Sequence, residues 1–147
     1  MKYLKLFESW NPVSDSAFAE AQELHSIGVV SDQELRELKK LREAEQLIIN
    51  YNGVGRLPLS YTTLLTGLPD GLKVGGRLEL HGCTSLTSLP AGLEVLGELV
   101  LKDCTSLRSL PDDLKIGGDL YLHGCTALTS LPAGLEVSGS LYIRGCT

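Results

Sequence analysis

The amino-acid sequence predicts a solenoid, which is a stack of short and mostly β turns, with a helical region capping its N-terminal end. Three observations support this prediction. A cysteine recurs every 21 residues, at Cys83, Cys104, Cys125 and Cys146. A Leu-Pro step recurs at the same interval, beginning at Leu68, Leu89, Leu110 and Leu131. Leucine, glycine and threonine keep their places between these markers. A fixed period of this length is typical of stacked repeats.

The composition fits a folded chain whose partner is neither a nucleic acid nor a membrane. Of 147 residues, 43% are hydrophobic and only 5% are aromatic, so leucine and valine have to fill the core. The net charge of −5 argues against nucleic-acid and anionic-membrane surfaces. No apolar run is long enough to span a bilayer, and Glu8 interrupts the N-terminal segment before a secretory signal forms. We therefore expect a cytoplasmic protein.

Residues 1–53 are expected to be helical and to cap the stack. A short amphipathic helix is predicted over residues 1–10, ending before Pro12. Its apolar positions are Tyr3, Leu6 or Phe7, and Trp10.

A helical hairpin is expected next. Ser14 or Asp15 can cap a helix that ends before Gly28, which suits the position after a helix C-terminus. Ser31 and Glu34 have the spacing of a capping box for a second helix. The apolar face of that helix is formed by Leu35, Leu38, Leu41, Ala44 and Leu47 or Ile48.

The solenoid is expected over residues 54–147, in about five turns of which the first is degenerate and the last is incomplete. In each unit an alternating Leu78-Glu79-Leu80 run predicts a half-buried strand, stacked in parallel on its neighbours about 4.8 Å away. Residues 56–59 fall in register with residues 77–80 and form the degenerate first turn. A glycine recurs at Gly76 and its equivalents, so either a side chain would clash there or the backbone needs a positive φ. Leu-Pro belongs on the return side, which we expect to be extended or 3₁₀ because 21 residues leave little room for a helix.

The repeat pattern L-x-L-x-G-C-T-x-L-T-S-L-P-x-G-L resembles that of leucine-rich-repeat proteins, with cysteine in the place often held by asparagine. The short unit and its Leu-Pro step resemble repeats of bacterial effectors, Gly-Cys-Thr resembles plant immune-receptor repeats, and V-G-G-x-L-x-L is similar to repeats in bacterial and phage reading frames. The resemblance implies a leucine-rich-repeat solenoid of bacterial or phage type. Such extended surfaces commonly bind other proteins.

A longer period of two turns overlies the short one. Asp70 and Lys73 recur 42 residues later as Asp112 and Lys115, whereas the turns between them carry alanine and glutamate. The sequence therefore predicts one column of alternating charge on neighbouring turns, formed by Lys73, Glu94, Lys115 and Glu136. Exposed pairs of this kind contribute about 0–1 kcal/mol each.

Residues that could carry chemistry are better explained by packing or solvation. All four cysteines occupy one position of the repeat and none forms a Cys-x-x-Cys pair, so buried thiols are expected rather than disulfides or a zinc site. His81 and His123 lie two turns apart, about 10 Å, which is too far to share a metal ion. No phosphate-binding loop and no nucleophile with a base can be identified. We expect no enzymatic activity, cofactor or metal.

The outward side of the predicted strands is the candidate binding surface, because its residues vary while the framework stays constant. Tyrosine and arginine favour protein interfaces, and both occur there. We therefore expect a protein partner to be bound by the residues Arg77, Glu79, His81, Val100, Lys102, Tyr121, His123, Tyr142 and Arg144.

Two other functions and a second contact stay open at this point. Residues 6–9, Leu-Phe-Glu-Ser, resemble the cleavage signal of tailed-phage head proteases, which favours a virion-associated or structural protein. The repeats could also be the substrate-recognition part of a larger effector enzyme. Finally, the last turn has no capping segment after it, so we expect either that this edge pairs with another chain or that the sequence is part of a longer repeat array.

Overall fold

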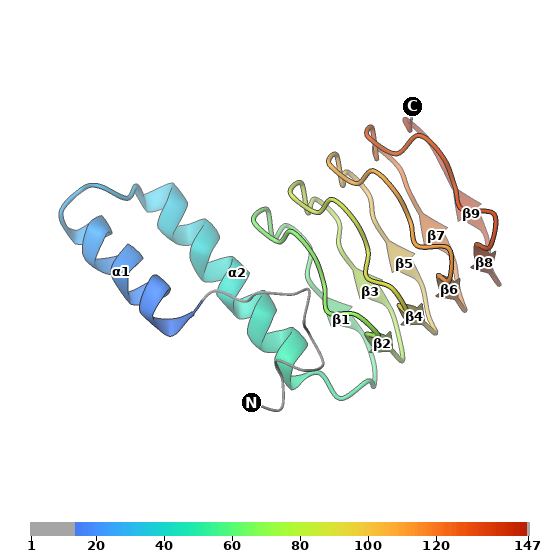
Figure 1. The fold of residues 1–147 in the computed structure, drawn as a ribbon, viewed down its shortest axis with the longest axis horizontal. Helices are drawn as coiled ribbons and strands as arrows, with labels where there is room; N and C mark the ends of the chain where they lie inside the picture. Colours follow the sequence, from blue (N-terminus) through green and yellow to red (C-terminus); the bar gives the residue numbers. More distant parts are fainter. Residues whose placement is uncertain (1–13, 147) are drawn as a thin grey trace.

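The computed structural model describes residues 14–146, which form two helices followed by a solenoid of stacked parallel strands (Figure 1). The predicted solenoid with a helical cap is confirmed. The helix expected over residues 1–10 and the motif at residues 6–9 lie outside the described residues. In order, the elements are α1 (Asp15–Ser26), α2 (Asp32–Asn50), β1 (Leu57–Pro58), β2 (Lys73–Val74), β3 (Leu78–Glu79), β4 (Glu94–Val95), β5 (Leu99–Val100), β6 (Lys115–Ile116), β7 (Leu120–Tyr121), β8 (Glu136–Val137) and β9 (Leu141–Tyr142).

Both helices begin at the predicted caps. The Ser14 hydroxyl accepts a hydrogen bond from the Ala17 amide at 3.1 Å. Ser31 and Glu34 form the full capping box, with the Glu34 amide 3.2 Å from the Ser31 hydroxyl and the Ser31 amide 2.8 Å from the Glu34 carboxylate. The Ser31 hydroxyl also donates to the Glu34 carboxylate at 2.7 Å, and this bond, together with the one from the Ser31 amide, holds the pKa of Glu34 below its ordinary value. Gly28, with φ of 77°, follows α1 as predicted.

Helix α2 covers the first turn of the stack (Figure 1). Ala44 and Ile48 are buried in the same core cluster as Leu57 and Leu59 of the first turn. Of the two alternatives for this apolar face, Ile48 is 2% exposed and Leu47 is 46% exposed. The helix therefore closes one end of the solenoid with part of its own apolar face.

Each full turn contributes two short strands, where the alternating pattern had predicted one. A five-stranded parallel sheet has the order β1-β3-β5-β7-β9, and a four-stranded parallel sheet has the order β2-β4-β6-β8. Leu57 pairs with Leu78 and Leu78 with Leu99, so the register of the degenerate first turn is as predicted. The return side consists of turns and extended backbone, with one isolated bridge between Ser88 and Ser109.

A column of glycines forms the corner between the two sheets. The Gly97 amide donates to the Gly76 carbonyl at 3.0 Å, and Gly118 repeats this bond to Gly97 at 2.9 Å. A Cβ atom on Gly97 would lie 2.6 Å from the Gly76 carbonyl carbon and oxygen, whereas its φ is outside the left-handed region. Of the two reasons offered for a glycine here, close backbone approach is the one that applies.

The cysteine column lines the core, as expected. Cys83, Cys104 and Cys125 are fully buried and free, and each thiol donates to a carbonyl of the preceding turn. Burial raises the pKa of Cys83 and of Cys125 to about 11. Thr62 stands at the cysteine position of the first turn, where no earlier turn exists, and its hydroxyl donates to Leu59 within the same turn at 2.8 Å. The thiol bonds are Cys83 to Leu59 (3.2 Å), Cys104 to Leu80 (3.1 Å), Cys125 to Leu101 (2.9 Å) and Cys146 to Leu122 (2.9 Å).

Candidate functional site

The outward residues of the five-stranded sheet form three columns, which we call the strand face. Leu78 and Leu80 point into the core and are fully buried, so the residues that alternate with them point outward. The parallel register aligns these residues from turn to turn. All nine predicted binding residues lie in the three columns, which are Arg77, Glu98, Asp119 and Ser140; Glu79, Val100, Tyr121 and Tyr142; and His81, Lys102, His123 and Arg144.

Ion pairs already occupy the N-terminal half of the strand face. Arg77 lies 3.0 Å from Glu98 and 3.6 Å from Glu79, and Arg56 of the first turn lies 3.8 Å from Glu79. Val100, the next residue in the central column, is only 6% exposed because it is shorter than its neighbours. This half therefore presents paired charges and little apolar area.

His81 has two neighbours that sequence reasoning missed. Its Nε2 atom lies 3.1 Å from the Asp103 carboxylate, and its ring centroid lies 4.9 Å from that of Tyr61. Tyr61 and Asp103 have φ of 60° and 59°, at the repeat position where other turns have a glycine such as Gly82. Left-handed backbone is costly for residues with a side chain, so His81 is positioned by two strained neighbours.

Aromatic and cationic side chains gather in the C-terminal half of the strand face. The rings of Tyr121 and Tyr142 are stacked, with centroids 4.7 Å apart and planes 5° from parallel. The Lys102 Nζ atom lies 4.9 Å from the centre of the Tyr121 ring, and the His123 ring lies 6.3 Å from Tyr142. Arg144 is exposed and forms no ion pair within the described part of the chain. We call these five residues the tyrosine cluster.

Asp119 anchors the tyrosine cluster to the backbone. Its carboxylate accepts a hydrogen bond from the Ser140 amide at 2.7 Å and one from the Tyr121 hydroxyl at 3.3 Å. Burial and the negative charges of Asp119 and Glu98 raise the pKa of Tyr121. Tyr121 is therefore a neutral hydroxyl donor around neutral pH, held in one orientation.

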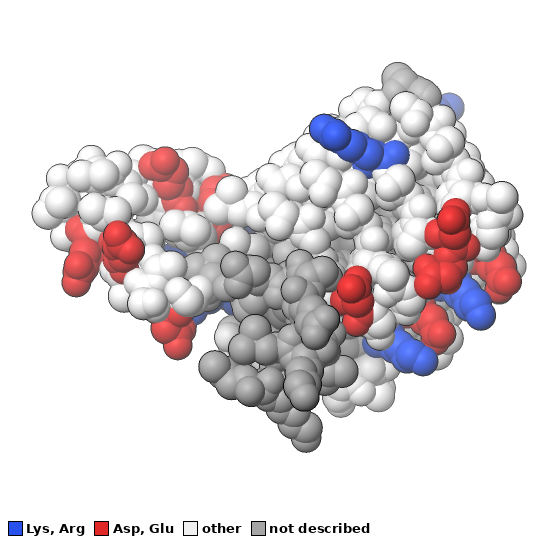
Figure 2. All heavy atoms as spheres, viewed as in Figure 1, with Lys and Arg blue, Asp and Glu red and all other residues white. Residues whose placement is uncertain are grey.

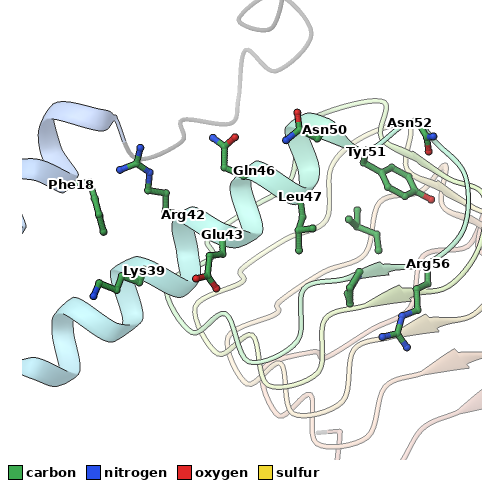
Figure 3. A pocket seen from close by; sticks show the side chains of 12 residues that line it. Phe18, Lys39, Arg42, Glu43, Gln46, Leu47, Asn50, Tyr51, Asn52 and Arg56 are labelled. Carbon is green, nitrogen blue, oxygen red and sulfur yellow. The ribbon is translucent and has the colours of Figure 1, made fainter.

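A groove between α2 and the first turn is a second candidate site, which sequence reasoning did not predict (Figure 3). It encloses about 820 Å³. Leu47 and Tyr51 contribute apolar surface, and Arg42 and Arg56 bring positive charge to it. Arg42 already pairs with Asp15 and lies 4.7 Å from the ring centre of Phe18.

The described residues show neither a cluster of metal ligands nor a membrane-spanning helix. Between residues 14 and 146, no group of three or more histidine, cysteine, aspartate or glutamate side chains is arranged to hold a metal ion. Neither α1 nor α2 is long and apolar enough to cross a bilayer.

The last described turn differs from the others in its exposure. Leu141 and Ile143 are 40% and 48% exposed, whereas Leu120 and Leu122 one turn earlier are fully buried.

No family model, curated protein or solved structure matches the chain.

Proposed function

We propose that the chain is a non-catalytic module of the leucine-rich-repeat type that binds a partner protein through the strand face. The observation that carries the proposal is the stack of the half-buried Tyr121 on the exposed Tyr142, with Lys102 and Arg144 beside it. Tyrosine and arginine are enriched among the residues that dominate protein binding energies.

The scaffold beneath the cluster supports this role. Leu120 and Leu122, on either side of Tyr121 in sequence, are fully buried, and Tyr121 is further held by Asp119. Side chains held in place before binding lose little conformational entropy when a partner arrives. The ion pairs around Arg77 and Glu79 form a polar border on the N-terminal side, as expected at the rim of an interface.

We propose the cytoplasm as the compartment of this module. The four cysteines are free, and a reducing compartment such as the cytoplasm keeps thiols in this state. A bacterial or phage-infected cell is the setting that the repeat pattern favours.

Affinity measurements on two double variants test the proposal. A partner is first captured with the wild-type chain, identified and purified. Tyr121→Ala with Tyr142→Ala should then weaken its binding about tenfold or more, because both rings are lost. Tyr121→Phe with Tyr142→Phe keeps the stacked rings and should retain most of the affinity.

The control and the contrary result are equally defined. Arg108→Ala lies on the exposed return side, outside both sheets, and should leave binding unchanged, and circular dichroism should show all variants folded. If the alanine double variant binds the partner as tightly as the wild type, the strand face is not the binding surface.

A further inference from the structure

The outward face of the four-stranded sheet carries a column of alternating charge. Parallel pairing aligns Lys73 with Glu94, Glu94 with Lys115 and Lys115 with Glu136. Blue and red side chains alternate along the edge where β2, β4, β6 and β8 lie (Figure 2). Lys73 lies 3.4 Å from Glu94, whereas Lys115 and Glu136 form no ion pair within residues 14–146. Two charges of the column are thus left for another molecule.

An exposed leucine and a notch lie next to this column. Leu96 is 69% exposed and is the one large apolar side chain so exposed between residues 68 and 130. Glycines occupy the same position on both neighbouring turns, at Gly75 and Gly117. A shallow hollow of about 320 Å³ is lined by Leu96, Gly117 and Ser138 together with Glu94, Lys115 and Glu136 of the charged column. The face therefore has one protruding leucine and, one turn later, a glycine that lines the hollow, which is the notch; the backbone of Leu96 leaves no room for a Cβ at this glycine.

The order of the charges makes this face complementary to itself. Read in reverse, the series plus, minus, plus, minus becomes minus, plus, minus, plus, so every charge meets its opposite. We infer that this face binds a second copy of the chain about a two-fold axis that runs along the strand direction between β4 and β6. Two copies running in the same direction would instead bring like charges together, which is unfavourable.

The two-fold arrangement also seats the leucine. Lys73 faces Glu136 and Glu94 faces Lys115, and each pairing occurs twice because a two-fold contact is reciprocal. Leu96 of each copy faces the notch at Gly117 of the other, since the same reversal exchanges these two turns. Each copy thus supplies both a protruding Leu96 and the notch at Gly117 that receives Leu96 of the other copy.

The adjoining column is compatible with the same axis. Its residues are Asp70, Ala91, Asp112 and Ala133, and reversal places each aspartate opposite an alanine. The two-turn period of the sequence explains this match. Turns with aspartate alternate with turns with alanine at this position, so reversing the order of the four turns always places an aspartate turn opposite an alanine turn.

A sheet of four strands about 4.8 Å apart offers a small contact area, so the dimer is weak and sensitive to salt. Sedimentation equilibrium of the whole chain, from micromolar to millimolar concentration at low salt, should show a monomer–dimer equilibrium whose dissociation constant rises with added salt. Leu96→Glu should raise that constant about tenfold or more, because the contact would bury a charge without a partner.

A charge swap and its compensation give the sharpest test. Glu94→Lys sets lysine against Lys115 of the other copy and should raise the dissociation constant about tenfold. Adding Lys115→Glu changes the column to plus, plus, minus, minus, which is again complementary on reversal, so dimerisation should return to within about threefold of the wild type. Circular dichroism would show that both variants remain folded.

Tyr121→Ala with Tyr142→Ala, on the strand face, should dimerise as the wild type does. The proposal is overturned if the wild type is a monomer throughout, if Glu94→Lys or Leu96→Glu has no effect, or if Lys115→Glu fails to compensate. A dimer formed through the exposed Leu141 and Ile143 of the last described turn would have the same dissociation constant after the charge swap, and would therefore give the result in which Glu94→Lys has no effect. None of these outcomes touches the proposed role of the strand face.

Discussion

Replacing Gly97 by alanine should push apart the two turns that Gly76 and Gly97 connect, and so lower the stability of the solenoid. Gly97 lies in the middle of the glycine column, between Gly76 and Gly118. An added Cβ would stand 2.6 Å from the Gly76 carbonyl carbon and oxygen and 3.0 Å from the Arg77 amide nitrogen. All three are backbone atoms, so no flexible side chain can move aside.

The magnitude follows from these distances. To reach an ordinary contact of about 3.4 Å, the two turns must separate by about 0.8 Å. The bond from the Gly97 amide to the Gly76 carbonyl would then lengthen from 3.0 Å to about 3.8 Å, beyond hydrogen-bonding range. An unsatisfied backbone pair costs about 1–3 kcal/mol and overpacking costs a similar amount, so unfolding free energy should fall by about 3 kcal/mol.

Urea unfolding followed by circular dichroism would measure this loss, and the midpoint should fall by about 1–2 M. Gly67→Ala is the matched control, because nothing lies within 4 Å of its added Cβ and its φ is outside the left-handed region. Gly71→Ala, with φ of 72° and no crowding, should fall between the two, at a cost of about 1 kcal/mol. If Gly97→Ala and Gly67→Ala unfold at the same urea concentration, close backbone packing is not the reason for the glycine column.

Two further predictions concern the thiols and the strained turn. Burial raises the pKa of Cys83 and Cys125 to about 11. In the unfolded chain the same thiols ionise at about pH 8.5, so between these two pH values they are protonated only in the folded chain. The contribution of these thiols to the free energy of unfolding is complete below about pH 8.5 and is lost as the pH rises through about 11. In urea titrations at a series of pH values, the double variant Cys83→Ala with Cys125→Ala should lose less stability over this range than the wild type. An equally steep loss in the double variant would exclude the thiols as its cause. Asp103→Gly should be more stable than Asp103→Ala by about 1 kcal/mol, because only glycine adopts φ of 59° without strain, and equal urea midpoints would show that this backbone is not strained.

The parts of the fold that depend on position within the repeat could be predicted from the sequence. The pairing of Leu57 with Leu78 needed only the alignment of a degenerate turn with its neighbour. The burial of the cysteines followed from their identical place in every unit. Each prediction holds because residues at the same position of neighbouring turns must pack on one another.

Contacts between residues at different positions of the repeat could not be predicted in this way. The division of each turn into two strands depends on how sharply the glycine corner bends, which alternation alone does not report. The groove between α2 and the first turn joins residues far apart in the chain. The strain at Asp103 did leave a signal, because Lys-Asp-Cys-Thr has aspartate where the flanking turns have glycine.

The two outward faces of the solenoid differ in their charge pattern. On the strand face, the reversal that matches opposite charges on the four-stranded sheet sets Glu98 against Asp119. This like-charged contact opposes self-association there, which favours a different molecule as the partner of the strand face. A dimer through the four-stranded sheet would therefore leave both strand faces free. Two such faces in one particle would bind a multivalent partner more tightly than either face alone, without any new contact.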